Sequence, residues 1–501
     1  MANTMRISGL ASGMDIDKIV SDLMKAERMP LDKLKQKKQL LEWQRDDYRS
    51  MNTLLQGLDD YLFNNITLQS GMMKKTVSSS NEGVITATAA SSAANVATTI
   101  QVNQVATSAV WLSDAATRVD KATFSVAADV TLTINVTNGD GSTKQAAITV
   151  KQGTTLDGVI AQLNNNANLG VSAFYDEQTG RISIMKKDTG AQASLVLADQ
   201  ATADFFAQKL GFTGAASGGE LTGKTAGTDA DITINGLQTT RSSNTFTING
   251  VTYTVKGTGA ATVSVAADVD AMFNAIKGFV DKYNETIDKI NAELKEERYR
   301  DYPPLTDEQK EAMTEKQIEL WEEKAKSGML RGDSILSSAL SKMRMNLYTK
   351  VEGANIPSGF SQLAQIGITT SSNYLDGGKL IIDETKLREK IKENPDAVYQ
   401  LFNQNGATDV EKGIARRLRD TIKETIGKIE QKAGKTIWTN QQFAIGRDLI
   451  QINDQIDRFQ DRLKQIEDRY YRQFTAMEEA IQRANQQSMY LMNAFGGGTQ
   501  R

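Results

Sequence analysis

Cysteine and histidine are both absent from this chain of 501 residues. The missing cysteine excludes disulfide bonds and thiol nucleophiles, and the missing histidine removes the usual general base and a common transition-metal ligand. A hydrolase or an oxidoreductase without either residue is uncommon. The composition therefore favours a protein that is not an enzyme, and we expect no catalytic residues, no cofactor and no metal.

Proline, long apolar runs and an excess of charge of one sign are also lacking. The five prolines leave the stretch between Leu31 and Tyr302 without one. No apolar run reaches 18 residues, and the N-terminus lacks the cationic start and apolar segment of a secretory signal peptide. Lys and Arg number 58 against 61 Asp and Glu. We therefore expect neither nucleic-acid binding nor membrane insertion.

A heptad pattern near the C-terminal end is the strongest feature that is present. Its apolar residues alternate four and three positions apart, with charged or amide residues between them. These seam residues are Ile445, Leu449, Ile452, Ile456, Phe459, Leu463, Ile466 and Tyr470. The next step, to Phe474, is again four, which is a stutter. From Ile445 to Phe495 the pattern predicts a helix of ~75 Å that needs partner helices, although an ordinary long bundle helix is equally compatible.

The N-terminal region supplies the expected partner. Ser12 or Asp15 can cap a helix, and Pro30 is expected to end that helix or to begin the next. A second apolar series follows at a spacing of seven residues: Leu41, Tyr48, Leu55 and Leu62. Because both ends of the chain are helical and the middle is not, we expect the two ends to form an antiparallel helical pair.

The middle of the chain has a different composition. Residues 76–265 contain 25 charged residues, about 13%, against 24% for the whole chain, and their apolar residues alternate as in strands. Asn249-Gly250 between two alternating runs predicts a hairpin with a type I′ turn. Within this region, residues 119–223 read as two strands, a short helix and two more strands.

These patterns predict a multidomain α+β protein with long terminal coiled-coil helices, a discontinuous helical domain and two β-rich domains inserted mid-chain. The expected domains are 1–45 with 444–501 (terminal coiled coil), 46–75 with 269–443 (helical rod), 76–118 with 224–268 (β-rich) and 119–223 (inserted ββαββ module). A very acidic stretch from Asp307 to Lys326 is expected to be a solvated helix, and no role can be assigned to it. Asp229 and Asp231 flank one residue, which a solvated strand end explains better than a metal site.

Four sequence blocks occur in a fixed order along the chain. The first covers residues 7–15, 19–24 and 30–31, and the second covers 229–236 and 241–244 with the hairpin after them. The third covers 328–334, and the fourth covers 366–370, 378–385 and 394–398, just before Leu401-Phe402. The first block contains Gly9, Leu10, Ser12, Gly13 and Asp15. Together the blocks resemble the flagellar filament cap protein family, also called hook-associated protein 2, over nearly the whole chain. The 119–223 insert resembles the small β-rich module of flagellins and hook-associated proteins.

The resemblance implies a structural assembly protein rather than an enzyme. It implies a homo-oligomeric ring, taken as a pentamer although no residue distinguishes five subunits from four or six. The ring would cap the distal end of the extracellular filament, promote flagellin polymerisation and prevent flagellin leakage. Implied partners are flagellin, the hook-filament junction protein and a flagellar export chaperone, with export through the flagellar type III system without a cleaved signal peptide. An adhesin acting through the outer β domains is the alternative.

Overall fold

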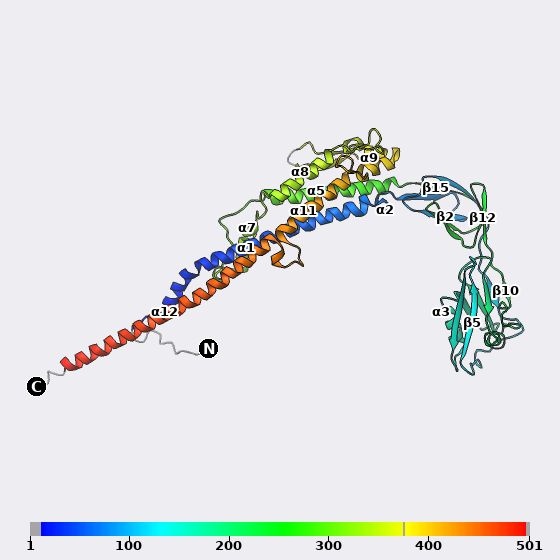
Figure 1. Ribbon diagram of the computed structural model, residues 1–501, viewed down its shortest axis with the longest axis horizontal. Coiled ribbons are helices and arrows are strands. Elements are labelled where there is room, and N and C mark those ends of the chain that lie inside the picture. The colour runs from blue at the N-terminus through cyan, green and yellow to red at the C-terminus, as the bar shows by residue number, and fades with distance from the viewer. Residues whose placement is uncertain (1–11, 374–375, 497–501) are drawn as a thin grey trace. The chain divides into compact units, whose positions relative to one another are not determined.

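The structure is a computed structural model, which describes residues 12–373 and 376–496 (Figure 1). Gly9 and Leu10 of the first sequence block lie outside the described residues. The chain divides into two compact units, and each is described by itself. The helical unit contains Met1–Leu68 and Phe273–Arg501, and the β unit contains Gln69–Met272.

The helical unit is built from long helices with short helices and one strand pair between them (Figure 1). In chain order its elements are α1 (Ile16–Tyr61), η1 (Leu62–Thr67), α5 (Val269–Lys295, of which the first four residues belong to the β unit), α6 (Asp307–Glu311), α7 (Glu315–Lys326), α8 (Ser334–Tyr348), η3 (Leu363–Ile366), β16 (Ile368–Thr370), β17 (Leu380–Ile382), α9 (Glu384–Glu393), α10 (Pro395–Asn403), α11 (Ile414–Ala433), η5 (Asn440–Gln442) and α12 (Ala444–Gly496).

Helix α1 passes through Pro30, so the expectation that this proline ends one helix or begins the next is wrong. Proline inside a helix removes one backbone hydrogen bond and clashes with the preceding turn. Buried apolar residues on both sides of it, Met24 and Leu31, pack into one cluster with α12, and this shared packing offsets the loss. The side chain of Asp15 caps the helix by accepting a hydrogen bond of 2.9 Å from the Lys18 amide.

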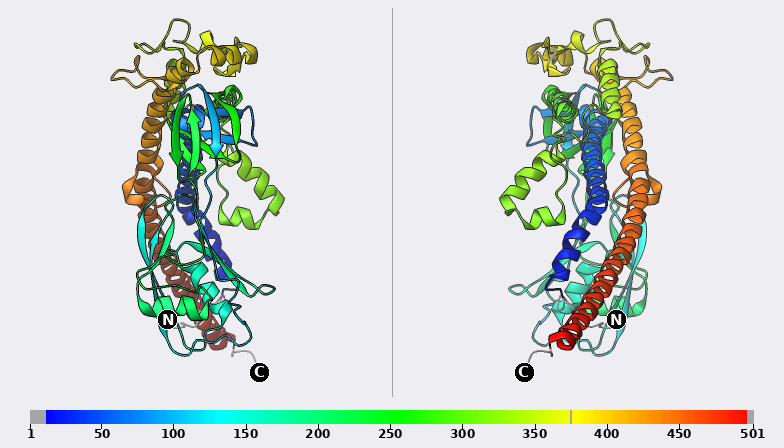
Figure 2. Two further views of the ribbon diagram at one scale, coloured as in Figure 1. Left: turned by 90° about the vertical axis from the view of Figure 1, so that its right-hand side faces the viewer. Right: turned by 90° about the vertical axis from the view of Figure 1, so that its left-hand side faces the viewer.

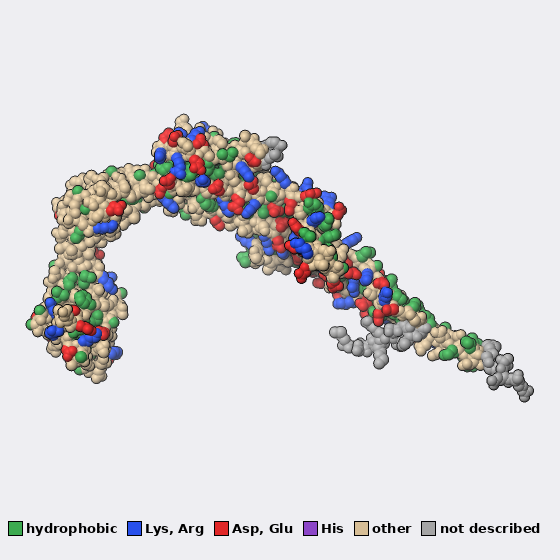
Figure 3. Space-filling view, turned by 180° about the vertical axis from the view of Figure 1, so that it is seen from behind, with side chains coloured by type: hydrophobic (Ala, Val, Ile, Leu, Met, Phe, Trp, Pro, Cys, Tyr) green, Lys and Arg blue, Asp and Glu red, His purple; other side chains and the backbone are tan. Residues whose placement is uncertain are grey.

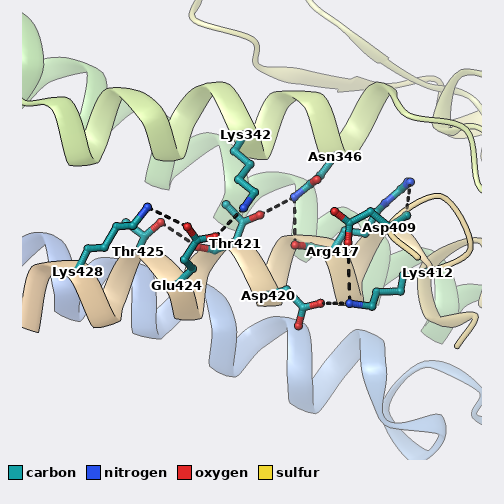
Figure 4. A network of polar contacts seen from close by, with 10 residues as sticks. All are labelled: Lys342, Asn346, Asp409, Lys412, Arg417, Asp420, Thr421, Glu424, Thr425 and Lys428. Carbon is teal, nitrogen blue, oxygen red and sulfur yellow. Dashed lines mark hydrogen bonds and ion pairs between the residues drawn. The ribbon is translucent and has the colours of Figure 1, made fainter. Parts of the chain in front are cut away.

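The core of the helical unit lies where α11 packs against both α1 and α8. On one side, the Arg419 guanidinium of α11 binds both carboxylate oxygens of Asp59 in α1, at 2.8 and 3.3 Å. On the other side, Asn346 of α8 donates to Thr421 Oγ1 of α11 at 2.7 Å (Figure 4). These polar contacts orient α11 between its two neighbours.

The partner of α1 changes along its length. The part of α1 before about residue 45 packs against α12, and the later part packs against α11. Helix α1 is continuous across residue 45, where the sequence was expected to divide into two helical domains.

The β unit contains strands β1 to β15 and four short helical segments. In chain order these are α2 (Gln69–Met72), β1 (Lys75–Ser79), β2 (Ile85–Ala89), β3 (Ala97–Gln104), β4 (Val110–Leu112), β5 (Val130–Thr137), β6 (Thr143–Val150), α3 (Leu156–Asn165), β7 (Val171–Asp176), β8 (Arg181–Lys186), β9 (Ser194–Leu197), α4 (Gln200–Asp204), η2 (Phe205–Lys209), β10 (Lys224–Thr225), β11 (Ala230–Ile234), β12 (Leu237–Arg241), β13 (Thr245–Ile248), β14 (Val251–Val255) and β15 (Gly259–Ala267). Figure 3 shows far fewer charged side chains on this unit than on the helical unit, in line with its composition.

One of its two cores lies between a five-stranded sheet, ordered β1-β15-β3-β11-β12, and a three-stranded sheet, ordered β13-β14-β2. The expected hairpin joins β13 to β14, with Asn249 and Gly250 at φ of 50° and 79° as a type I′ turn requires. Asn235 and Gly236 make a turn with the same signs of φ between β11 and β12.

The second core lies between a four-stranded sheet, ordered β10-β4-β8-β7, and a three-stranded sheet, ordered β6-β5-β9. Its limits differ from the expected 119–223, because β4 and β10 both belong to it. Trp111 of β4 is fully buried in this core, since its large side chain finds an apolar partner surface there. Two segments connect this second core to the first, one between β3 and β4 and one between β10 and β11. They meet at Thr107 and Thr228, whose hydroxyl groups are 2.9 Å apart.

Candidate assembly interface: the terminal helix pair

The two terminal helices, α1 and α12, pack along one apolar seam. Four residues from each helix are buried there: Ile16, Val20, Met24 and Leu31 of α1, and Ile452, Ile456, Leu463 and Ile466 of α12. Leu41, Phe459 and Tyr470 are partly buried against the same cluster. Burying each large aliphatic side chain contributes roughly 1.5–3 kcal/mol, so this seam is a substantial stabilising contact.

Polar contacts beside the seam fix an antiparallel register. The hydroxyl of Tyr471 donates to Asp17 at 3.1 Å, and that of Tyr470 donates to Glu27 at 3.0 Å. Nearer the start of α1, the Ser12 hydroxyl donates to Glu478. Early residues of α1 therefore lie beside late residues of α12.

The other seam residues predicted from the sequence occupy different surroundings. Ile445 and Leu449 are buried at the start of α12, outside the cluster just described. Tyr48, Leu55 and Leu62 are buried in the stretch that packs against α11 rather than against α12. Burial and a hydrogen bond to Asp333 of the α8 N-cap raise the pKa of Tyr48, which ties this part of α1 to α8.

Beyond Glu478, helix α12 continues without α1 beside it. Met489, Tyr490, Leu491 and Met492 are 62%, 76%, 53% and 72% exposed. Hydrophobic side chains are visible at this end of the helix in Figure 3. Among residues 12–373 and 376–496, no other element packs over this apolar series, and such an exposed series is typical of a surface that another chain covers.

A second apolar surface was not foreseen from the sequence. Tyr299, Tyr302 and Trp321 line a cavity of about 680 Å³ between the end of α5 and α7. The expected single solvated helix at 307–326 is in fact two helices, α6 and α7, each begun by a threonine capping box. Tyr299 and Tyr302 shortly before this charged stretch, with Trp321 inside it, were the available signal.

Each of the two aspartates weighed as metal ligands from the sequence accepts a hydrogen bond within the β unit. Asp229 accepts a hydrogen bond from the Ala191 amide at 2.8 Å, and Asp231 accepts from Gln238 at 3.1 Å. Among residues 12–373 and 376–496, no three or more Asp, Glu, Cys or His side chains gather as a metal site. Over the same residues, no helix has the length and apolar character needed to span a membrane.

Family models match three successive parts of the chain. The flagellar hook-associated protein 2 N-terminus matches residues 12–109, the flagellin hook IN motif matches 131–188, and the flagellar hook-associated protein 2 C-terminus matches 227–486. The matches at both ends define a hook-associated protein of the bacterial flagellum. The chain belongs to the flagellar hook-associated protein 2 family.

Individual relatives agree with this assignment. Flagellar hook-associated protein 2 of Halalkalibacterium halodurans is 35% identical, over 98% of this chain and 100% of the relative. The protein of the same name from Escherichia coli (strain K12) is 26% identical, over 97% of each chain. The crystal structure of the D1-D2-D3 domains of the flagellar cap protein FliD from Escherichia coli matches with a TM-score of 0.56 and 24% identity, over 78% of this chain and 96% of that one. This structural match confirms the predicted α+β fold class.

Proposed function

We propose that this chain is a structural subunit of the cap at the distal, extracellular end of the bacterial flagellar filament. A homo-oligomeric ring of such subunits, taken as a pentamer, holds the tube closed, promotes flagellin polymerisation and prevents flagellin leakage. The observation that supports this most directly is the α12 seam, which continues past the start of α1 as an exposed apolar surface. Such a surface needs a second chain to cover it.

The exposed apolar surface of α12 would contact different partners before and after the cap assembles. In the assembled cap it packs against other subunits or against flagellin and the hook-filament junction protein. Before assembly an export chaperone covers it, because free apolar helix surface promotes aggregation. The absence of cysteine suits passage of an unfolded chain through the flagellar type III system, since no disulfide has to be avoided or reformed.

The test places charge on the exposed seam without disturbing the folded core. Ala484→Asp with Leu491→Asp puts two carboxylates one heptad apart on residues that are already exposed. Cells carrying this variant should release flagellin monomer into the medium and swim poorly. The measurements are flagellin in the culture supernatant by immunoblot and filament length by electron microscopy.

The matched control adds the same two charges to the side of the same segment that faces away from Ala484 and Leu491. Gln482→Asp with Gln486→Asp changes exposed residues on the opposite side of α12 and should leave filaments normal. Normal filaments with the seam variant, or equal failure of the control, would contradict the proposed role of the seam. The adhesin alternative is not proposed, because no feature in the described part of the β unit favours it.

A further inference from the structure

The aromatic pocket beside α7 has fixed walls and an open mouth. The rings of Tyr302 and Trp321 lie with centroids 4.7 Å apart, and Trp321 Nε1 donates to the Pro303 carbonyl at 2.8 Å. Leu320, also in the lining, is 52% exposed. A cavity of about 680 Å³ with this lining can take a large apolar side chain and the backbone around it.

The surroundings of the pocket carry negative charge. Glu296, Glu297 and Glu323 line it together with one basic residue, Lys324. The stretch 307–326 that forms α6 and α7 contains seven acidic and four basic residues. An occupant of complementary chemistry is therefore an apolar side chain on a segment that carries lysine or arginine.

The loop between α11 and α12, residues 434–443, presents such a side chain. Ile437 is 88% exposed, although isoleucine is among the residues most often buried. Lys432 at the end of α11 and Lys435 in the loop precede it, and both are exposed; Lys435 also pairs with Glu430 at 3.1 Å, so Lys432 is the lysine that offers its charge most directly to a partner. An exposed isoleucine beside two lysines is therefore complementary to this pocket: the apolar side chain fits the aromatic lining, and the positive charges are opposite in sign to the glutamates.

The loop is held in one conformation. Arg49 of α1 donates to the carbonyl oxygens of Ala433 at 3.1 Å and Lys435 at 3.2 Å. Gly434 has φ of +69°, and a Cβ there would meet the Phe443 ring at 2.3 Å, so the backbone turns closely over that ring. A rigid loop loses little conformational entropy when Ile437 is buried by a partner.

The pocket and the loop lie on opposite sides of the helical unit. Figure 2 shows α6 and α7 projecting from one side, and the loop before α12, in orange, projecting from the other. One copy therefore cannot fill its own pocket, whereas neighbouring copies can join head to tail. Contacts of this kind are heterologous, and they close into rings when the rotation between subunits allows it.

We propose that Ile437 of one copy of this chain inserts into the aromatic pocket of the next copy. This inference rests on the proposed function, because it names the contact between neighbouring subunits of the ring. The glutamates around the pocket attract Lys432 and Lys435 beside Ile437 and so orient the approach, and the apolar contact stabilises the complex.

Cross-linking in the full-length chain tests the contact, and the absence of native cysteine makes every engineered thiol unique. Ile437→Cys protein is mixed with Leu320→Cys protein under mild oxidation. We expect disulfide-linked dimers in the mixture and at least tenfold fewer in either protein alone. Glu319→Cys, next to the pocket residue but outside its lining, is the control and should link to Ile437→Cys at least tenfold more slowly.

A second measurement does not depend on disulfide geometry. Ile437→Ala removes only exposed atoms, so the chain should fold normally and its self-association should weaken at least tenfold by sedimentation velocity. Thr436→Ala, also exposed, should change it less than twofold. Unchanged association with Ile437→Ala would overturn the proposal, as would equal dimer formation by a single cysteine variant. Binding of added flagellin that Leu320→Asp weakens while self-association stays unchanged would also overturn it, because flagellin would then be the occupant.

Failure of this contact can be told from failure of the cap function. If Ile437→Ala assembles normally while Ala484→Asp with Leu491→Asp releases flagellin, the contact is wrong and the function stands. If the α12 variant also grows normal filaments, the proposed function itself is wrong.

Discussion

Asp47 is a half-buried carboxyl group on α1 that faces other carboxyl groups. Burial, with Glu293, Glu296 and Asp46 nearby, raises its pKa from 3.8 to about 7. The folded protein therefore keeps a proton that the unfolded chain has already released at neutral pH. The free energy of unfolding should fall as the pH rises from about 4 to about 7, because the folded state binds more protons over that interval.

We expect Asp47→Asn to remove this pH dependence. The variant should equal the parent near pH 4 and exceed it by about 1–2 kcal/mol at pH 8, a value reduced for solvent screening of a half-exposed group. Urea denaturation at a series of pH values measures the difference. Asp60→Asn, an exposed site on the same helix, is the control, and its free energy of unfolding should depend on pH as that of the parent does. If the free energy of unfolding of Asp47→Asn ran parallel to that of the parent over the pH series, Asp47 would not be the group responsible.

Single residues also mark the limit of what the sequence could predict. The spacing of Ile452, Ile456 and Leu463 identified residues that the structure buries, because a one-sided apolar series must face a partner. The same spacing could not say which helix that partner would be. Tyr48 and Leu55 were expected near the seam of α12 or of its neighbours, and they lie in the part of α1 that packs against α11, a neighbour of α12. Only the three-dimensional path of α1 decides between these helices.

Among the elements, helices with regular patterns were predictable and short elements were not. Helix α12 and the hairpin at Asn249-Gly250 follow from local rules, because periodicity and turn chemistry act within a few residues. The continuous helix through Pro30 and the three-residue strand β4 depend on tertiary packing. The aromatic pocket also escaped notice, because it forms only when α7 folds back onto the end of α5.

The α1–α12 pair gives an element-scale prediction. Ile456→Asp with Leu463→Asp places two carboxylates in the buried cluster, where each must be desolvated or left next to apolar side chains. We expect a loss of about 2–5 kcal/mol in the stability of the helix pair. Loss of protection in residues 16–31 and 452–466, measured by hydrogen exchange, would report it.

Two aspartates introduced at exposed positions of α12 are the control for the two introduced into the buried cluster. Gln465→Asp with Gln473→Asp adds two charges to the solvent face and should change protection little. Equal loss in both variants would mean that charge on α12, rather than burial in the seam, causes the effect.

For the whole molecule, the second β core should be removable. Its connecting segments meet at Thr107 and Thr228, so a short linker can join them. Replacing residues 109–226 with a Gly/Ser linker should leave the helicity and the thermal midpoint of the remainder within about 5 °C of the parent values. Circular dichroism measures both, and insoluble protein would count against this boundary.

The antiparallel terminal pair also sets an order of folding. Tyr470 and Glu27, which share a hydrogen bond, are separated by 443 positions in the chain. A contact of such high sequence separation closes late, whereas the hairpins of the β unit join neighbours within a few residues. Pulse-labelled hydrogen exchange during refolding should therefore find protection first in β13 and β14 and last in residues 16–31. A chain delivered from its N-terminus would keep its apolar seam unpaired until its final segment had emerged.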